Sequence, residues 1–359
     1  MRRIRLLFAA FLFLPYLQIY AQDQPWHIGA VPQANAAMAA INTINIKPGS
    51  HQIVVAVIDS GVITEHPSLQ GVVLPGYDML SPPNNLRGAR SSDVHPDERD
   101  ARCGSKMMSG QFRTHGTEVS SLIAGNGVDG VYGVNTKARI LPIRLFGACG
   151  MRKPDLLDAI SWAAGLPVAG IPLNPHPARV INLSLAGGGM VCSPPLQELI
   201  NQLTEKKIFV VAAAGNNFHR PLPEPANCQG VISVGAVDAE NRIEVYSAMD
   251  KRTVLYAPGG GKKLSSSEPW GENKLMVASY DLDFFGKEKP IAELRGVGTS
   301  FAAPVVAGFV SLWLSRNPEK SPADFWQSLP QFLRKVEPIE KCPECVPMGL
   351  NAGNRIIQQ

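Results

Sequence analysis

The sequence has little charge and no strong excess of either sign. Charged residues make up 18% of the 359 residues, which is below the usual share for a globular protein. The formal net charge is +4, but three of these charges belong to Arg2, Arg3 and Arg5 in an N-terminal stretch without acidic residues, so a balance of about +1 remains. A nearly neutral chain gives no indication of a nucleic-acid partner or a membrane-surface partner, and we expect neither.

The chain also lacks a second C-x-x-C motif. Cys342 and Cys345 form the only one, and a zinc site needs about four ligands. A redox C-x-x-C normally opens a helix after a strand, whereas this one is flanked by Pro near the C-terminus. A local structural disulfide is the better interpretation of this pair.

No apolar run reaches the roughly 20 residues that span a membrane. Residues 6–14 are apolar, follow the basic residues 2–5, and precede Pro15 and Ala21. This pattern predicts a signal peptide over residues 1–21, and no Cys stands near it to accept a lipid. We expect a secreted or periplasmic protein with no membrane association after leader removal.

Two familiar motifs are absent on inspection. Around Ser300 the sequence GTSFA departs from G-x-S-x-G, because Ala302 replaces the final Gly and no strand directly precedes it. Residues 125–130 fit G-x-G-x-x-G, but they follow a predicted helix rather than a strand. The chain therefore has neither a hydrolase nucleophile elbow nor a dinucleotide-binding loop.

Short apolar segments alternate with helical ones along the chain. The apolar segments do not alternate with polar residues, as expected of strands buried on both faces. They are residues 53–58, 140–146, 180–185, 208–214 and 231–237, and the helical segments are residues 117–124, 155–164 and 194–206. This order predicts an α/β fold of three layers, with a mainly parallel central sheet and helices on both faces. We expect one domain over residues 22–359, with loops at residues 81–109 and 259–271.

Polar residues follow two of these strands directly. Asp59 and Asn216 come at carboxyl ends, where parallel sheets bind ligands. Residues 300–315 are apolar almost all round, which predicts a buried helix with Ser300 at its N-terminus. Pro304 is expected in the first turn of that helix, where a missing N–H costs little.

Asp59, His115 and Ser300 stand in the segments VVAVIDSGV, THGTEVSSLIAG and GTSFAAPVVAG. A hydroxyl nucleophile needs a base, and the base needs a carboxylate to orient it. Taken singly, Asp59 or Ser300 is explained as a helix cap, and His115 as one of seven histidines. Three such residues within extended motifs favour a catalytic triad.

The chain resembles the subtilisin-like serine proteases, in particular their bacterial secreted, disulfide-containing branch. The resemblance rests on the three segments in the order Asp, His, Ser and on residues 158–187 and 225–237, and it runs from about residue 26 to 353. It implies the subtilisin-like fold and an exported serine endopeptidase that needs no cofactor for its chemistry. It also implies a monomer with protein or peptide substrates. The alternative is a catalytically inactive binding or scaffold protein of the same fold.

The resemblance further implies how substrate is held. Asn216 matches the family's oxyanion-hole donor, although Gly-Asn-Asn is also a turn sequence. An extended peptide would pair as an added strand with two backbone segments, beside a neutral pocket that gives broad specificity. The residues of these segments are Gly147, Ala148, Cys149 and Gly150, and Ser184, Leu185, Ala186 and Gly187.

Six cysteines in an exported chain predict disulfides, but the sequence alone leaves 15 connectivities open. The resemblance favours a Cys103–Cys149 bond and a Cys192–Cys228 bond. Cys342–Cys345 is then the remaining pair.

Three features depart from the family pattern. No long pro-segment lies between the leader and the catalytic region. The loop after Asp59 holds only four acidic residues, Asp93, Asp97, Glu98 and Asp100, whereas calcium takes about six or more oxygen ligands; we expect no catalytic metal and leave structural calcium open. Glu118 stands where relatives often carry His, one turn after His115.

Overall fold

The computed structural model describes residues 49–96, 111–217, 221–238, 242–248, 250, 253, 255–261, 275–282, 288–295 and 297–332. Seven strands form one parallel sheet in the order β2-β3-β1-β4-β5-β6-β7. Their bounds are β1 Val54–Asp59, β2 Tyr77–Asp78, β3 Arg139–Arg144, β4 Val180–Leu183, β5 Phe209–Ala213, β6 Ile232–Val237 and β7 Leu255–Pro258. All five predicted strands are present.

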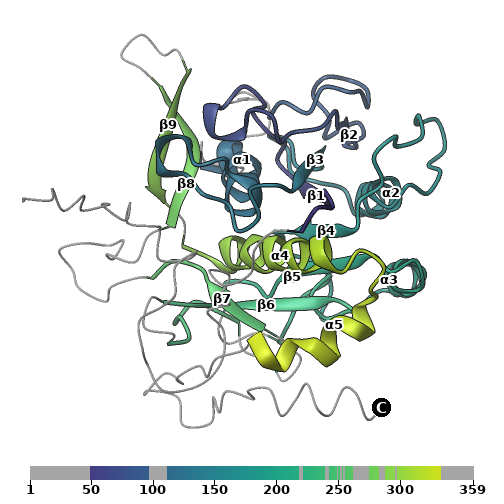
Figure 1. Cartoon of the computed structure of the whole chain (residues 1–359). Coiled ribbons are helices and arrows are strands. Elements are labelled where there is room, and N and C mark those ends of the chain that lie inside the picture. Colours follow the sequence, from purple (N-terminus) through teal and green to yellow (C-terminus); the bar gives the residue numbers. More distant parts are fainter. Residues whose placement is uncertain are drawn as a thin grey trace, which may run out of the picture.

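Helices cover both faces of this sheet. Successive strand residues point to opposite sides, and since they are apolar on both sides, each face packs against helices. Val55 and Val57 of β1 pack in one core with three helices, α1 (Gln111–Ala124), α4 (Thr299–Arg316) and α5 (Pro322–Ser328). Ala56 and Ile58 pack in a second core with α2 (Lys153–Ala163) and α3 (Pro194–Glu205). The predicted three-layer α/β fold is confirmed, and Figure 1 shows α4 lying along the sheet.

The strand order places a switch point between β1 and β4. From β1 the chain reaches β3 on one side, while β4, β5, β6 and β7 follow in turn on the other. In open parallel sheets this is where the crevice for a ligand forms, beyond the carboxyl ends of the strands. Asp59 ends β1, and Ser184 directly follows β4, so both lie at that crevice.

Helix α4 is apolar on nearly every side and almost completely buried. It begins at Thr299, so Ser300 lies in its first turn as predicted. Pro304 was expected in the first turn of this helix, but it lies in the second turn. Its missing N–H cannot bond the carbonyl of Ser300. That carbonyl accepts a hydrogen bond of 2.7 Å from Ser184 Oγ instead.

An antiparallel hairpin stands apart from the main sheet. It consists of β8 (Leu275–Leu282) and β9 (Glu288–Arg295), and β8 packs against α1. Figure 1 shows the hairpin beside α1, at one end of the molecule. The sequence analysis did not foresee it.

Short elements complete the described fold. The 3-10 helices are η1 (Pro67–Leu69), η3 (Val128–Gly130) and η4 (Leu329–Phe332). None of the helices within the described residues is long and apolar enough to cross a membrane. The predicted leader, residues 1–21, and most of the predicted loop at 259–271 lie outside the described residues.

Candidate active site

Asp59 and His115 form a close pair at the carboxyl end of β1. His115 Nδ1 lies 2.8 Å from Asp59 Oδ1 and 3.0 Å from Oδ2. The carboxylate is nearly fully buried, at 3% side-chain exposure, and also accepts a bond of 2.7 Å from the N–H of Ser60. A carboxylate on Nδ1 fixes the tautomer of a neutral imidazole, so Nε2 is left as the basic nitrogen.

Helix α1 approaches the β1 turn closely enough to require glycine after His115. A Cβ atom at Gly116 would lie 2.1 Å from the carbonyl oxygen of Gly61 and 3.2 Å from Asp59 Cβ. Ser60 Oγ accepts a bond of 3.1 Å from the N–H of Gly116. The segment THGT therefore lets the helix lie directly on the turn that carries Asp59.

Opposing effects act on the pKa of His115. Burial alone would lower it, but the charge and hydrogen bond of Asp59, together with the charge of Glu118, raise the pKa above its usual value. The raised pKa means that the site stabilises the imidazolium form.

The first turn of α4 lies beside His115. The ring of Phe301, the residue after Ser300, contacts the His115 ring edge-on at a centroid distance of 5.5 Å. Ser184 holds the Ser300 carbonyl, and Asn182 Nδ2 in turn donates to Ser184 Oγ over 2.9 Å. Residues at the end of β4 thus hold the backbone carbonyl of Ser300.

Asn216 also lies at the N-terminus of α4. Its Oδ1 accepts bonds of 2.8 Å from both the N–H and the Oγ1–H of Thr299. These two contacts orient the side chain, so its Nδ2 faces Gly298, where a Cβ atom would lie only 3.0 Å away. Asn216 is thereby fixed as a donor next to Ser300, and the glycine leaves the space near that donor open.

The first predicted substrate segment is a tight turn. The N–H of Gly150 donates to the carbonyl of Gly147 over 2.9 Å, and the reverse bond is 3.3 Å. Asn84 Nδ2 donates to the carbonyl of Cys149 over 3.0 Å. The two glycines are paired with each other here, so the strand pairing expected of Gly147, Ala148, Cys149 and Gly150 stays a prediction.

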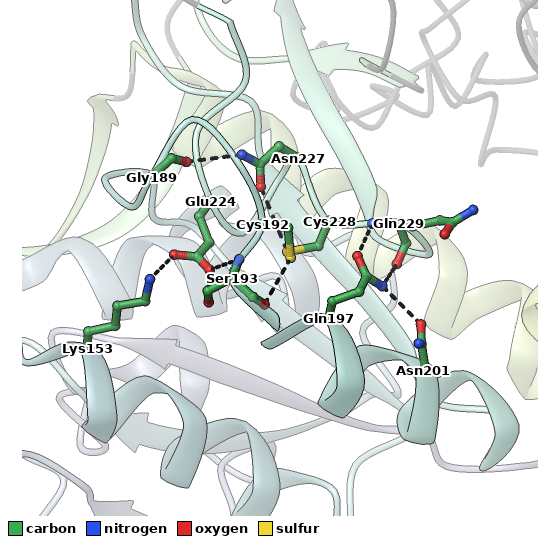
Figure 2. The surroundings of a disulfide bond; sticks show 10 residues. All are labelled: Lys153, Gly189, Cys192, Ser193, Gln197, Asn201, Glu224, Asn227, Cys228 and Gln229. Carbon is green, nitrogen blue, oxygen red and sulfur yellow. Dashed lines mark hydrogen bonds and ion pairs between the residues drawn. A yellow bond between two sulfur atoms is a disulfide. The ribbon is translucent and has the colours of Figure 1, made fainter. Parts of the chain in front are cut away.

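The second segment, from Ser184 to Gly187, continues from β4 into a loop held by Glu224. The carbonyl of Glu224 accepts from the N–H groups of Gly187 and Gly188, and its own N–H donates to Gly189. Its carboxylate accepts from the N–H of Ser193 over 2.8 Å (Figure 2).

The same carboxylate reaches the other wall of the predicted cleft. Lys153 Nζ, at the start of α2, lies 2.7 Å from Glu224 Oε2. Burial by itself would raise the pKa of Glu224, but hydrogen bonds from Lys153 and Ser193 lower it. A charged Glu224 therefore connects the loop after β4 to the helix that follows the Gly147 turn.

One predicted disulfide is confirmed. Cys192 and Cys228 are bonded, with Cα atoms 5.0 Å apart, next to the Glu224 contacts (Figure 2). Cys149 is also disulfide-bonded. Its predicted partner Cys103 lies outside the described residues, as do Cys342 and Cys345.

The described residues contain a cluster of side-chain types that can bind metals. Within them, one group of potential metal ligands lies close together, namely Cys192, Glu224 and Cys228. The two sulfurs are bonded to each other, so they are not thiolates. This cluster therefore has a structural disulfide at its centre.

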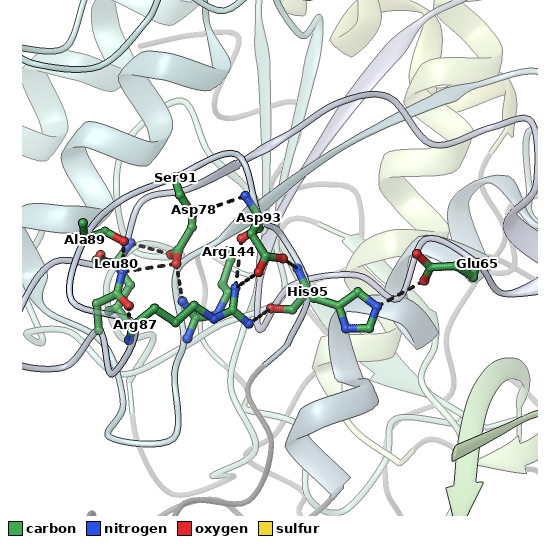
Figure 3. Close-up of polar contacts among 10 residues, drawn as sticks. Glu65, Asp78, Leu80, Arg87, Ala89, Ser91, Asp93, His95 and Arg144 are labelled. Carbon is green, nitrogen blue, oxygen red and sulfur yellow. Dashed lines mark hydrogen bonds and ion pairs between the residues drawn. The ribbon is translucent and has the colours of Figure 1, made fainter. Parts of the chain in front are cut away.

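Arg87 holds part of the loop after Asp59, for which the sequence left structural calcium undecided. Arg87 donates to the carbonyls of Asp93 and His95 and pairs with the Asp93 carboxylate at 3.0 Å (Figure 3). The Asp93 carboxylate thus has the guanidinium of Arg87 as its partner. The acidic residues Asp97, Glu98 and Asp100 lie outside the described residues.

A second buried ion pair, between a carboxylate and an arginine, lies on β2 and β3 at the same edge of the sheet as Asp59. Asp78 at the end of β2 pairs with Arg144 at the end of β3, and both side chains are fully buried (Figure 3). Asn85 Nδ2 donates to Asp78 as well, over 3.2 Å. Arg144 pairs in register with Asp59 across the sheet.

Several contacts that shape the site were not predicted from the sequence, including the one that Ser184, a predicted substrate-segment residue, makes to Ser300. Thr299 orients Asn216, Ser184 holds Ser300 through a side-chain bond, and Glu224 supports the loop from Gly187 to Gly189. Only the residue types were visible in the sequence, because each contact joins distant parts of the chain.

Residues 50–335 match the subtilase family, peptidase S8. An extracellular protease of Xanthomonas campestris is 36% identical over 85% of this chain and 53% of its own length. An extracellular basic protease of Dichelobacter nodosus is 35% identical over 73% of this chain and 43% of its own length. The chain spans about half the length of these curated relatives.

Solved structures agree with this result. A protease from Pseudoalteromonas arctica superposes with a TM-score of 0.70 at 32% identity, over 84% of this chain and 88% of that chain. A cold-adapted subtilisin-like serine proteinase matches with a TM-score of 0.57 at 22% identity, over 83% of this chain and 87% of that one, which supports the fold alone. The family match over most of the chain, with relatives above 30% identity, shows that the chain belongs to the subtilase family.

Proposed function

We propose that this protein is an exported serine endopeptidase that hydrolyses peptide bonds with Ser300, His115 and Asp59. The observation that carries the proposal is the contact of His115 Nδ1 with Asp59, 2.8 Å long, next to the first turn of α4. Family membership and the extracellular proteases among the relatives support it.

In this mechanism Ser300 Oγ attacks the carbonyl carbon of the scissile bond. His115 Nε2 takes the hydroxyl proton as general base and later donates it to the leaving amine. Asp59 keeps the Nδ1–H tautomer and stabilises the imidazolium ion that forms. Water then repeats the sequence on the acyl-enzyme, again with His115 as base.

The oxyanion of the tetrahedral intermediate would be bound by the N–H of Ser300 and by Asn216 Nδ2. The bonds from Thr299 support this role, because they turn the amide oxygen of Asn216 away and leave the nitrogen to donate. A donor fixed before the reaction stabilises developing charge without reorganisation. Helix α4 adds its N-terminal dipole at the same place.

The substrate would be a protein or peptide in an extended conformation. Ala186 and Pro223 lie close to Gly215, at 3.6 Å and 3.5 Å from the position of a Cβ atom there. These small apolar neighbours support a pocket for neutral or apolar side chains. Glu224, the nearby buried carboxylate, is already paired with Lys153 and adds no free charge.

Labelling with a fluorophosphonate tests the proposal, because such probes react with an activated serine and not with an ordinary one. We expect one covalent adduct, mapped by mass spectrometry to Ser300. Ser300→Ala should lose it, and the exposed Ser50→Ala should label like the natural protein. Absence of an adduct at Ser300 in folded protein, together with no cleavage of casein, would favour the inactive scaffold instead.

A further inference from the structure

Glu118 is a buried carboxylate that the mechanism above does not use. It lies three residues after His115 on α1, and it is 3% exposed. Its Oε1 accepts a bond of 2.6 Å from Thr114 Oγ1 and one of 2.9 Å from Ser279 Oγ. The second contact joins the active-site helix to β8, so the position of this carboxylate is fixed from two elements.

Both of these donors are neutral hydroxyl groups. A carboxylate that accepts such bonds is stabilised in its ionised form. Charges in a buried setting act over longer distances than charges in water. Glu118 can therefore act on groups along its own helix.

His115 is the site residue on which the charge of Glu118 acts. Residues three apart on a helix are neighbours on its surface, and the charge of Glu118 acts to raise the pKa of His115. From the other side, Asp59 on β1 contacts the ring directly, whereas Phe301 on α4 adds no charge.

The remaining titratable groups around α1 do not replace this effect. His66 packs against Tyr280, and burial lowers the pKa of His66, which favours its neutral form. The charged or titratable groups are Arg113 on α1 itself, Asp59 on β1, Arg139 and Arg144 on β3, His66 beside η1, Tyr280 and Asp281 on β8, and Arg316 at the far end of α4. Arg144 is already paired with Asp78.

We propose that Glu118 is a positioning residue of the active site: a second carboxylate that, with Asp59, stabilises the imidazolium form of His115. The inference rests on the proposed function. When the O–H bond of Ser300 breaks and the N–H bond at His115 Nε2 forms, the resulting cation faces Asp59 directly and Glu118 one helical turn away. The bond from Ser279 makes β8 part of this arrangement.

Glu118→Gln separates charge from shape. The amide keeps the size of the side chain and an oxygen that accepts from Thr114 and Ser279, but it removes the negative charge. The acid limb of the kcat/KM profile should then move to lower pH. In the Ser300→Ala background, the NMR titration of the His115 ring protons should move in the same direction. Glu65→Gln, which removes an exposed carboxylate near η1, is the matched control and should move neither.

A second measurement leaves Glu118 in place, in case the Gln variant does not fold. In the Ser300→Ala protein labelled with ¹³C at Glu carboxyls, the Glu118 resonance should shift as His115 titrates, because coupling between two sites is reciprocal.

The outcomes separate this inference from the proposed function. A His115 titration that is the same in folded Glu118→Gln protein, or a Glu118 resonance that ignores it, overturns the role of Glu118 even if Ser300 still reacts with a fluorophosphonate. Lack of labelling at Ser300 overturns the protease proposal, while the NMR titrations still report on the coupling of Glu118 to His115.

Discussion

Asp59 ends β1 and Asp78 ends β2 of the same sheet, with β3 between them, and each carboxylate is paired with a basic side chain. Asp59 pairs with His115, whose side chain is 13% exposed, and Asp78 pairs with Arg144, which is fully buried. An imidazole is the kind of side chain that can exchange a proton near neutral pH, whereas a guanidinium is the kind that forms fixed, bidentate contacts. In the proposed mechanism the Asp59–His115 pair takes part in proton transfer, whereas the Asp78–Arg144 pair is a fully buried structural contact.

The energetic balance of the two pairs also differs. Burial raises the pKa of Asp78 above its usual value, although the charge of Arg144 acts in the opposite direction. Desolvation therefore outweighs attraction, as is common for buried ion pairs. Removing one partner of such a pair should lower the free energy of unfolding strongly, because the remaining buried charge would lose its counter-charge.

Removing the charge of Asp59 should have the largest effect. Asp59→Asn should lower kcat by about 10⁴-fold, because the amide no longer selects the Nδ1–H tautomer of His115. Stability should change little, since Asn still accepts from the N–H of Ser60. Steady-state kinetics on a peptide substrate and urea unfolding measure the two effects. Asp129→Asn, at an exposed turn, is the control, and near-normal kcat in folded Asp59→Asn would refute the role of this pair.

The reverse result is expected for the structural pair. Arg144→Met should cost about 3–5 kcal/mol of unfolding free energy, because Asp78 stays buried without its cation. The folded fraction should keep its kcat within a few fold.

The double variant Asp78→Asn with Arg144→Met tests the reason for that loss. It removes the orphaned charge and keeps an acceptor for the N–H of Leu80, so it should recover part of the stability in urea unfolding. If the double variant is less stable than Arg144→Met alone, desolvation of Asp78 is not the cause.

Variants of Asn216 test the oxyanion hole proposed next to Ser300. Asn216→Leu should lower kcat by about 10²–10³-fold with little change in KM, since the amide donor acts mainly on the transition state. Asn216→Asp keeps the acceptor for Thr299 but loses the donor, and should be at least as slow. An unchanged kcat in both variants would remove Asn216 from the oxyanion hole.

The smallest effect is the pH dependence. The pKa of His115 is raised above its usual 6.5 in the folded protein. Its protonated form therefore adds stability that is fully present below about pH 6.5 and is lost as pH rises through the folded pKa. Activity should rise over the same window, because the neutral imidazole is the base.

Urea unfolding of the natural protein and of His115→Ala between pH 5 and 9 measures the difference, since the variant should lose this contribution. Equal pH slopes for the two proteins would contradict the raised pKa.

Five of the seven strands of the sheet and the candidate site residues could be predicted from the sequence. Buried parallel strands have a continuous apolar pattern, so segments such as 53–58 and 208–214 were visible without any contacts. Asp59, His115 and Ser300 stand in distinctive local segments. The Cys192–Cys228 bond followed from family resemblance and is confirmed.

Tertiary structure alone decided how these residues are held. Ser184 and Ser300 are 116 residues apart, Glu118 and Ser279 are 161 apart, and Asp78 and Arg144 are 66 apart. A serine or a glutamate has the same local pattern whatever its partner, because hydrogen bonds between side chains depend on position in space. The triad segments could be recognised from sequence for the opposite reason: the turns and helix ends that carry them are formed by neighbouring residues.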